Sequence, residues 1–268
     1  MTRSPNIMGD RFNAFLKSGW VRFPSDPGIA RWAKKALPFA HAAIADPANR
    51  QWMRCGGTWH VGVNALPNGA DGTLPDGTPL AGPVIAFAHH VAGRAFDWDP
   101  AQVSAVYPGY PRQEQESDAA FAFRRDRDAA HVDGLKRKPD MTRHLEEAHA
   151  FILGIPLTKN DPASSPLVVW EGSHIIMREA FMQALSRQPE ESWTRQNLTE
   201  VYAQARRKCF QSCKRIELSA QPGESYVLHR LSLHGVSPWK SNDDGNQGSR
   251  MIAYFRPSLP LTGLWLTG

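Results

Sequence analysis

The most informative segment of the chain is Asp128-Ala-Ala-His131-Val132-Asp133-Gly134-Leu135. Side chains two residues apart on a β-strand point to the same face, so His131 and Asp133 would present an imidazole and a carboxylate side by side. This pair supplies two of the three ligands in the 2-His-1-carboxylate arrangement that binds Fe(II). A solvated strand end would give the same triplet, so the interpretation depends on a third ligand.

A candidate third ligand lies in the later stretch Gly223-Glu-Ser-Tyr-Val-Leu-His229-Arg-Leu-Ser-Leu-His234-Gly-Val-Ser-Pro-Trp239. The turn at Pro222-Gly223 predicts a strand after it, then a short break and a second strand that carries His234. His234 follows Asp133 by 101 residues (234 − 133), which suits a ligand from a distant strand. His229 is the alternative ligand.

The third feature of the sequence is a basic residue, Arg250, that follows His234 by 16 residues. The Asn-, Asp- and Gly-rich segment 241–249 predicts a loop, and the next strand begins at Arg250, beside the strand of His234. A guanidinium can hold a carboxylate through two hydrogen bonds, so Arg250 could fix the far end of a dicarboxylate whose other end chelates iron. Arg256 is a less favoured substitute.

The remaining pattern predicts a sheet-rich body. Helical spacing predicts helices at 10–19, 26–44, 175–186 and 198–208. Short apolar stretches predict strands at 20–23, 54–63, 84–92, 102–107, 119–124, 148–156, 167–170, 215–219, 224–228, 231–236 and 251–255. Many short strands between Gly and Pro turns indicate an antiparallel sandwich or barrel, so the fold class is mainly β with flanking helices (α+β).

Length and composition limit the alternatives. A chain of 268 residues with sheet-like patterning suits a single domain, 1–268, with N-terminal helices and a Gly/Pro-rich surface loop at 64–83. The net charge of +5 is too small to indicate nucleic acid. No apolar signal core or membrane-length apolar run occurs, and three cysteines do not indicate a disulfide scaffold. We therefore expect a soluble cytoplasmic protein.

The order of these motifs resembles the phytanoyl-CoA dioxygenase-like family of Fe(II)/2-oxoglutarate-dependent oxygenases over nearly the whole chain. The motifs that carry the resemblance are Phe15-Leu-Lys-Ser-Gly-Trp20-Val-Arg-Phe-Pro24, His131-Val-Asp133-Gly134, Val169-Trp-Glu-Gly172-Ser173-His174, Pro222-Gly223-Glu, His229-Arg-Leu-Ser-Leu-His234-Gly235 and Arg250. Two features depart from the family pattern. Glu171 replaces a proline, and the interval from His234 to Arg250 is long.

The resemblance implies a double-stranded β-helix (a cupin-like jelly roll) with Fe(II) held by His131, Asp133 and His234. It implies that Arg250 grips 2-oxoglutarate and that O2 is the second cosubstrate. Ser237 is a further candidate contact to 2-oxoglutarate.

The substrate pocket is less well defined by the sequence. His174 is placed near the metal by the resemblance, although packing and helix capping beside Ser173 explain it equally well. Trp170 and Trp239 are candidate lining residues, with core packing as the alternative. The basic residues within 124–143 could attract an anionic small-molecule substrate, or they could form a solvated face of mixed charge.

The predicted function is therefore oxidation of a small molecule, most simply hydroxylation, coupled to conversion of 2-oxoglutarate to succinate. Two alternatives stay open. One is a non-catalytic β-barrel that binds an anionic small molecule, and the other is a metal cupin that does not use 2-oxoglutarate. The sequence does not identify the substrate or the oligomeric state.

Overall fold

The computed structural model describes residues 7–241 and 248–267. Its α-helices are α1 (Ile7–Ser18), α2 (Pro27–Ala45), α3 (Pro83–Ala92), α4 (Asp118–Asp126), α5 (Ser173–Leu185), α6 (Thr199–Ser212) and α7 (Leu264–Thr267). Two 3-10 helices are η1 (Pro47–Trp52) and η2 (Glu190–Arg195). Its strands are β1 (Trp20–Phe23), β2 (Met53–Arg54), β3 (Trp59–Asn64), β4 (Gln102–Val106), β5 (Leu135–Arg137), β6 (Arg143–Leu145), β7 (Phe151–Pro156), β8 (Leu167–Trp170), β9 (Arg215–Leu218), β10 (Ser225–His229), β11 (His234–Val236) and β12 (Arg250–Phe255).

These strands form two main sheets and one hairpin. The large sheet has the order β1-β10-β7-β12-β4-β3-β2, the small sheet has the order β11-β8-β9, and β5 pairs with β6. Every pairing within them is antiparallel. The predicted combination of antiparallel strands with flanking helices is confirmed, and most of the predicted loop 241–249 lies outside the described residues.

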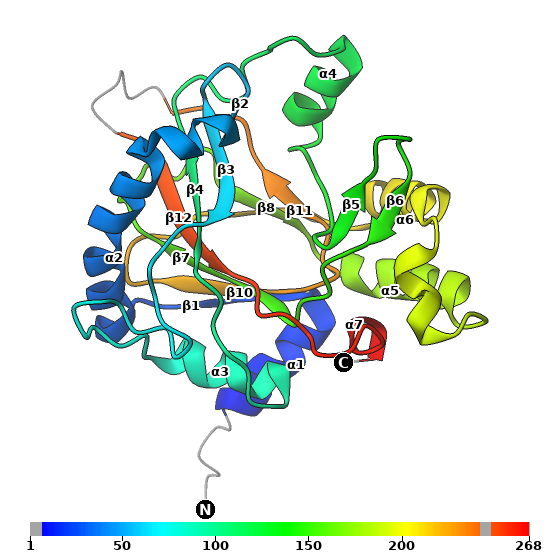
Figure 1. Cartoon of the computed structure of the whole chain (residues 1–268), viewed down its shortest axis with the longest axis horizontal. Coiled ribbons are helices and arrows are strands. Elements are labelled where there is room, and N and C mark those ends of the chain that lie inside the picture. Colours follow the sequence, from blue (N-terminus) through cyan, green and yellow to red (C-terminus); the bar gives the residue numbers. More distant parts are fainter. Residues whose placement is uncertain (1–6, 242–247, 268) are drawn as a thin grey trace, which may run out of the picture.

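The large and small sheets pack face to face (Figure 1). Alternate side chains of both sheets meet in one buried cluster, as the two-residue period of a strand requires: Ile152, Leu167, Val169, Leu218, Tyr226, Leu228 and Ile252. The site described below lies at one end of this interior.

Helices cover the outer faces of both sheets (Figure 1). Apolar residues of α1, α2 and α3 pack against the outward side chains of β4, β7 and β12, among them Met251, Ala253 and Phe255. Helices α5 and α6 cover the outward side chains of β8. Helix α2 begins where the sequence predicts, because the Asp26 carboxylate caps it by accepting hydrogen bonds from the backbone of Gly28 and Ile29.

Two segments predicted as strands are helices. Segment 84–92 forms most of α3, because a short apolar run does not distinguish a buried strand from a buried helix. Pro83 at the first turn and left-handed Gly93 after the last are helix signals that the prediction overlooked. Segment 119–124 lies in α4, which Ser117 caps by accepting a hydrogen bond from Ala120.

Two further segments differ in detail from the prediction. Residues 54–63 form a hairpin of β2 and β3, because Cys55, Gly56 and Gly57 adopt positive φ angles and reverse the chain. The Gly/Pro-rich segment contains no helix or strand from 65 to 82. It is nevertheless packed: Leu66, Leu74 and Leu80 are buried, and the Trp32 indole donates to the Gly72 carbonyl.

No helix among residues 7–241 and 248–267 has the length and apolar character that crossing a membrane requires.

Gly235 allows the segment before His131 to approach β11. A Cβ atom at Gly235 would lie 2.1 Å from the backbone oxygen of Asp128, which also accepts a hydrogen bond from Val236. We expect Gly235→Ala to destabilise the protein by about 1–3 kcal/mol, since neither backbone can yield easily. Urea unfolding would measure the change. Gly248→Ala is the control, because a Cβ there meets no atom within 4 Å, and equal stability of the two variants would contradict the prediction.

Candidate metal centre

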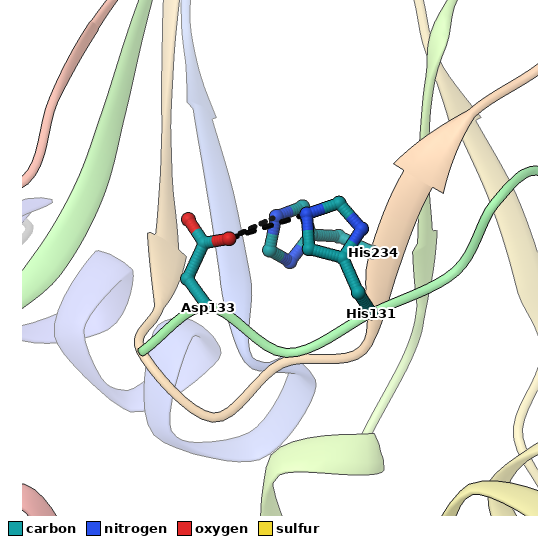
Figure 2. Close-up of side chains that lie close together, drawn as sticks. All are labelled: His131, Asp133 and His234. Atoms are coloured by element: carbon teal, nitrogen blue, oxygen red, sulfur yellow. Dashed lines mark ion pairs between the residues drawn. The ribbon is translucent and has the colours of Figure 1, made fainter. Parts of the chain in front are cut away.

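His131, Asp133 and His234 form one compact group, and it is the only such group of potential metal ligands among the described residues (Figure 2). His131 and His234 are directly opposite each other in an antiparallel bridge that adds His131 to the edge of the small sheet. Their backbones exchange two hydrogen bonds, of 2.8 and 3.0 Å. The strand predicted for this motif is wrong, because only His131 forms a bridge and Asp133 lies two residues later in a turn. The turn still carries the Asp133 carboxylate to the two imidazoles.

The ligand atoms of the group converge. The Asp133 Oδ1 atom lies 3.2 Å from His131 Nε2 and 3.9 Å from His234 Nε2, and all three ligand atoms lie within 4.8 Å of one another. Adjacent ligands that each bind an ion at about 2.1 Å lie about 3 Å apart, so a small inward movement would complete the coordination. Figure 2 shows the carboxylate turned toward both imidazole rings.

Both imidazole rings are oriented by backbone carbonyls. His131 Nδ1 lies 3.0 Å from the Ala129 oxygen, and His234 Nδ1 lies 2.9 Å from the Ser232 oxygen. When each Nδ1–H donates to its carbonyl, each Nε2 faces Asp133 and is the nitrogen left to bind a metal ion. The two rings are therefore oriented for metal binding through Nε2, and in His131 a metal ion would replace the proton that Nε2 donates to Asp133.

The electrostatics favour an ionised carboxylate beside a neutral imidazole. Burial opposes ionisation of Asp133, but Arg256 and then the two histidines hold the pKa of its carboxyl well below the ordinary value. Burial, followed by the charge of His131, lowers the pKa of His234 to about 4. Burial lowers the pKa of His131 and the hydrogen bond to Asp133 raises it, with a net upward shift. His131 is the most exposed of the three side chains, at 44%.

A cavity of about 210 Å³ extends from the three ligands into the space between the sheets, and we call it the metal cavity. Its wall is mostly apolar: Trp59, Val61, Ile152, Leu167 and Val236. Its polar wall residues besides the ligands are Gln102, Ser104, Tyr254 and Arg256. An ion bound at the mouth would thus face a narrow interior that excludes most water.

Arg250 lies at the inner end of this interior. It is 5% exposed and occupies a row with Val106 and Trp59 across β12, β4 and β3. Trp59 lines the metal cavity, whereas Arg250 lies beside the lining. The Arg250 Nη1 atom is buried without a hydrogen-bond partner, and no carboxylate of the described residues forms an ion pair with this guanidinium. Arg250 is therefore a buried cation with an unused donor.

Arg256 lies at the mouth of the metal cavity. Residues 250, 252, 254 and 256 share one face of β12 and its extension, so the two arginines are at opposite ends of that face. The Arg256 Nη1 atom is 2.9 Å from Asp133 Oδ2, and its Nη2 atom is 3.7 Å from Glu147 Oε2. Its cationic head is thus already engaged by two carboxylates.

Two of the other predicted residues lie on the outer side of the small sheet. Ser237 is buried, donates to Glu217 and accepts from Arg215, both at 3.4 Å. Trp170 packs against Phe210 of α6, with ring centroids 5.2 Å apart. Neither side chain lines the metal cavity, because the strand period turns both to the helix-covered face. Their assignments to cosubstrate and substrate find no support in these positions.

Of the remaining predicted residues, His174 and His229 lie away from the metal cavity and Trp239 lies close to it. His174 is the second residue of α5, and its Nε2 atom lies 2.9 Å from the Leu16 oxygen. Its ring is tilted by 44° against the His229 ring, with centroids 4.8 Å apart, and it does not line the metal cavity. His229, the alternative ligand, accepts a hydrogen bond from the Leu231 backbone instead. Trp239 packs in the cluster that contains Trp59 and Val236, so it lies close behind the inner wall of the metal cavity.

The basic segment 124–143 is largely neutralised. Arg125 pairs with Asp126, Lys136 with Glu147, and Lys138 with Glu146. Arg124 pairs with Glu116, and the Arg143 guanidinium lies over the Tyr202 ring. These contacts match the solvated face of mixed charge that the sequence also allowed.

A second cavity of about 410 Å³ adjoins the first, and it shares Gln102 and Arg256 with it. We call it the polar cavity because polar side chains predominate in its wall: Asn64, Asp99, Gln102, Glu147, His149, Arg256 and Ser258. Sequence reasoning missed this cavity, since its residues come from loops between distant strands. The alternation 250, 252, 254, 256 was a signal that could have placed Arg256 at the mouth.

His149 in this wall gives the metal-free protein a pH-dependent stability. Burial lowers the pKa of His149 to about 4 in the folded state, against about 6.5 when unfolded. The unfolded chain therefore takes up the proton first, and stability present above pH 6.5 is lost as the pH falls toward 4. Protonation of His149 should lower the free energy of unfolding by about 2 kcal/mol between pH 7.5 and pH 5.

The free energy of unfolding of metal-free protein, measured in urea at both pH values, tests this expectation. In His149→Gln, the decrease in the free energy of unfolding from pH 7.5 to pH 5 should be about 2 kcal/mol smaller than in the wild-type protein. His144→Gln, at a half-buried hairpin position, is the control and should leave the fall unchanged. An unchanged fall in His149→Gln would show that other groups cause it.

Comparison with solved structures reveals similar folds. The non-heme alpha-ketoglutarate-dependent carbocyclase SnoK from nogalamycin biosynthesis has a TM-score of 0.55 and 13% identity over 96% of this chain and 84% of its own. The epimerase SnoN, solved with Fe3+, alpha-ketoglutarate and nogalamycin RO, has a TM-score of 0.54 and 12% identity over 95% of this chain and 84% of its own. At these identities the likeness concerns the fold. No protein-family model and no curated protein sequence matches the chain.

Proposed function

We propose that the protein is an Fe(II)- and 2-oxoglutarate-dependent oxygenase that hydroxylates a small molecule. The observation that carries the proposal is the convergence of two imidazole Nε2 atoms and one carboxylate oxygen, from His131, His234 and Asp133, at the mouth of a cavity. Two nitrogens and one oxygen on one side of an ion are the donor set of non-heme Fe(II) oxygenases. The fold shared with SnoK and SnoN supports the proposal.

We further assign the two facing sheets to a double-stranded β-helix of the phytanoyl-CoA dioxygenase-like type. The strand order supports this assignment, because the two histidines lie at the edge of the small sheet while Arg250 begins a central strand of the large one.

Arg250 is the residue we assign to the distal carboxylate of 2-oxoglutarate. A buried guanidinium without an ionic partner is costly, and a carboxylate from the cosubstrate would compensate it. Arg256 is less suited to this role, since Asp133 and Glu147 already engage it. The assignment requires the side chains beside Trp59 to make room between Arg250 and the metal cavity.

Bound Fe(II) would activate O2 so that 2-oxoglutarate is converted to succinate and CO2 while one oxygen atom enters a substrate C–H bond. The chain supplies the rest. Its histidines and Asp133 hold the ion, Arg250 orients the cosubstrate, and apolar residues such as Ile152, Leu167 and Val236 keep water out of the metal cavity.

We place the primary substrate in the polar cavity, which adjoins the metal cavity at Gln102 and Arg256. Its amide, carboxylate and imidazole side chains suit a polar molecule with several hydrogen-bonding groups, and they do not suit a lipid acyl chain.

Formation of succinate tests the proposal. Protein stripped of metal with a chelator should form no succinate, and Fe(II) with 2-oxoglutarate under air should restore a slow basal rate. Polar metabolites with hydroxyl or amine groups should raise that rate, whereas acyl-CoA thioesters should not. An iron-loaded protein that consumes no 2-oxoglutarate with any compound would contradict the proposed function.

A further inference from the structure

The two oxygens of the Asp133 carboxylate have different partners. Oδ1 faces the Nε2 atoms of the two histidines, at 3.2 and 3.9 Å. Oδ2 is 2.9 Å from Arg256 Nη1, which comes from the residue after β12. The carboxylate is thus held with one oxygen toward the ligand group and the other away from it.

We propose that Arg256 is a positioning residue that restricts Asp133 to binding a metal ion through Oδ1 alone. A free carboxylate can bind an ion through one oxygen or both, and the second mode occupies an additional coordination position. An arginine that engages Oδ2 competes with that mode. This inference rests on the proposed metal site, but it does not depend on the identity of the cosubstrate.

Arg256 is itself held in place from the other side. Its Nη2 atom lies 3.7 Å from Glu147, and Glu147 also pairs with Lys136 on β5. The backbone of Glu147 donates to the Gly134 carbonyl, directly after Asp133. A Cβ atom at Gly134 would clash with the backbone oxygen of Glu147, and the φ angle of +90° at Gly134 also favours glycine. Gly134 therefore lets the chain bring Glu147 and Asp133 to opposite sides of one guanidinium.

The position of Arg256 also matters for the open side of the metal site. Arg256 forms part of the wall of both the metal cavity and the polar cavity. Coordination through both carboxylate oxygens would draw Asp133 away from this wall and use a position that an incoming ligand needs. Arg256 thereby keeps open the side of the site that adjoins the polar cavity.

The visible absorption spectrum of the Co(II)-loaded protein tests the inference, because the spectrum depends on coordination number and is independent of turnover. Arg256→Met should change the position and intensity of the Co(II) bands and weaken the binding of 2-oxoglutarate to the Co(II) protein about 10-fold. Arg256→Lys keeps a cation near Oδ2 and should restore most of the wild-type spectrum. Arg22→Met, which removes the surface pair with Glu224, is the matched control.

The possible outcomes separate the claims. A wild-type spectrum in Arg256→Met, with intact circular dichroism, would overturn the positioning role. A changed Co(II) spectrum in Arg256→Met would support the positioning role. If, in addition, the Co(II) bands of the wild-type protein do not change when 2-oxoglutarate is added, the proposed cosubstrate is contradicted. Failure of the wild-type protein to bind Co(II) would overturn both.

Discussion

Asp133→Ala is expected to lower the rate of Fe(II)-dependent succinate formation by more than about 100-fold, because even the partners of metal ligands contribute 10- to 100-fold to affinity or activity. The substitution removes the only carboxylate of the ligand group and leaves Arg256 without its closer partner. Succinate can be quantified after incubation with Fe(II), 2-oxoglutarate and air.

Asp126→Ala is the matched control for Asp133→Ala, since Asp126 lies seven residues before Asp133 and is a surface carboxylate that pairs with the adjacent Arg125. It should retain wild-type succinate formation. Substantial succinate formation by Asp133→Ala would contradict the assignment of this ligand set, whichever metal is bound.

Arg250→Ala is expected to raise the KM for 2-oxoglutarate by about 100-fold or more with a smaller effect on kcat. Loss of one partner of a buried ion pair costs about 3–5 kcal/mol, and Arg250 is buried with an unused donor. Steady-state kinetics with increasing 2-oxoglutarate would measure the change. Arg250→Lys should be intermediate, because lysine keeps the charge and loses the planar pair of donors.

A comparison of two keto acids makes the Arg250 test specific. 2-Oxopentanoate has the same chain length as 2-oxoglutarate but no distal carboxylate. Wild-type protein should strongly prefer 2-oxoglutarate, and Arg250→Ala should lose this preference. If the variant keeps the preference and Arg256→Ala loses it, the carboxylate clamp is Arg256 and our assignment is wrong.

The candidate metal ligands could be predicted from the sequence because their signal is local. His131 and Asp133 are two residues apart, and the motif predicts a strand that places them on one face. In the structure Asp133 lies in a turn just after the bridge residue His131, so the short spacing and not a strand brings the two side chains together. His234 required the further idea that a distant strand lies opposite, and the bridge between His131 and His234 confirms their proximity.

The fold was predicted best where strands alternate clearly and worst in short apolar runs. Strand 20–23 alternates between buried and more exposed residues and has the predicted bounds, whereas 84–92 is a helix whose decisive signals, Pro83 and Gly93, lie just outside the apolar run. Ser237 is predicted to contact the cosubstrate, and Trp170 to line the pocket or, alternatively, to pack in the core. Their strands carry them near the site, but the two-residue period turns their side chains to the opposite face.

The polar cavity and the role of Arg256 could not be predicted in the same way. Asp99, Glu147 and Arg256 come together through sheet register and loop packing, and no local pattern encodes that proximity. The pairing of β12 with β4 brings Tyr254 opposite Gln102 and so carries Arg256 to the mouth.

The most direct test of the account is an anaerobic titration of Fe(II)-loaded protein with 2-oxoglutarate, followed by visible absorption. The account predicts a charge-transfer band of chelated 2-oxoglutarate in wild-type protein, its loss in Asp133→Ala, and a higher half-saturation concentration in Arg250→Ala. A wild-type protein that binds iron without this band would contradict the account and favour a metal cupin that does not use 2-oxoglutarate. Neither iron binding nor a band would instead indicate a non-catalytic binding protein.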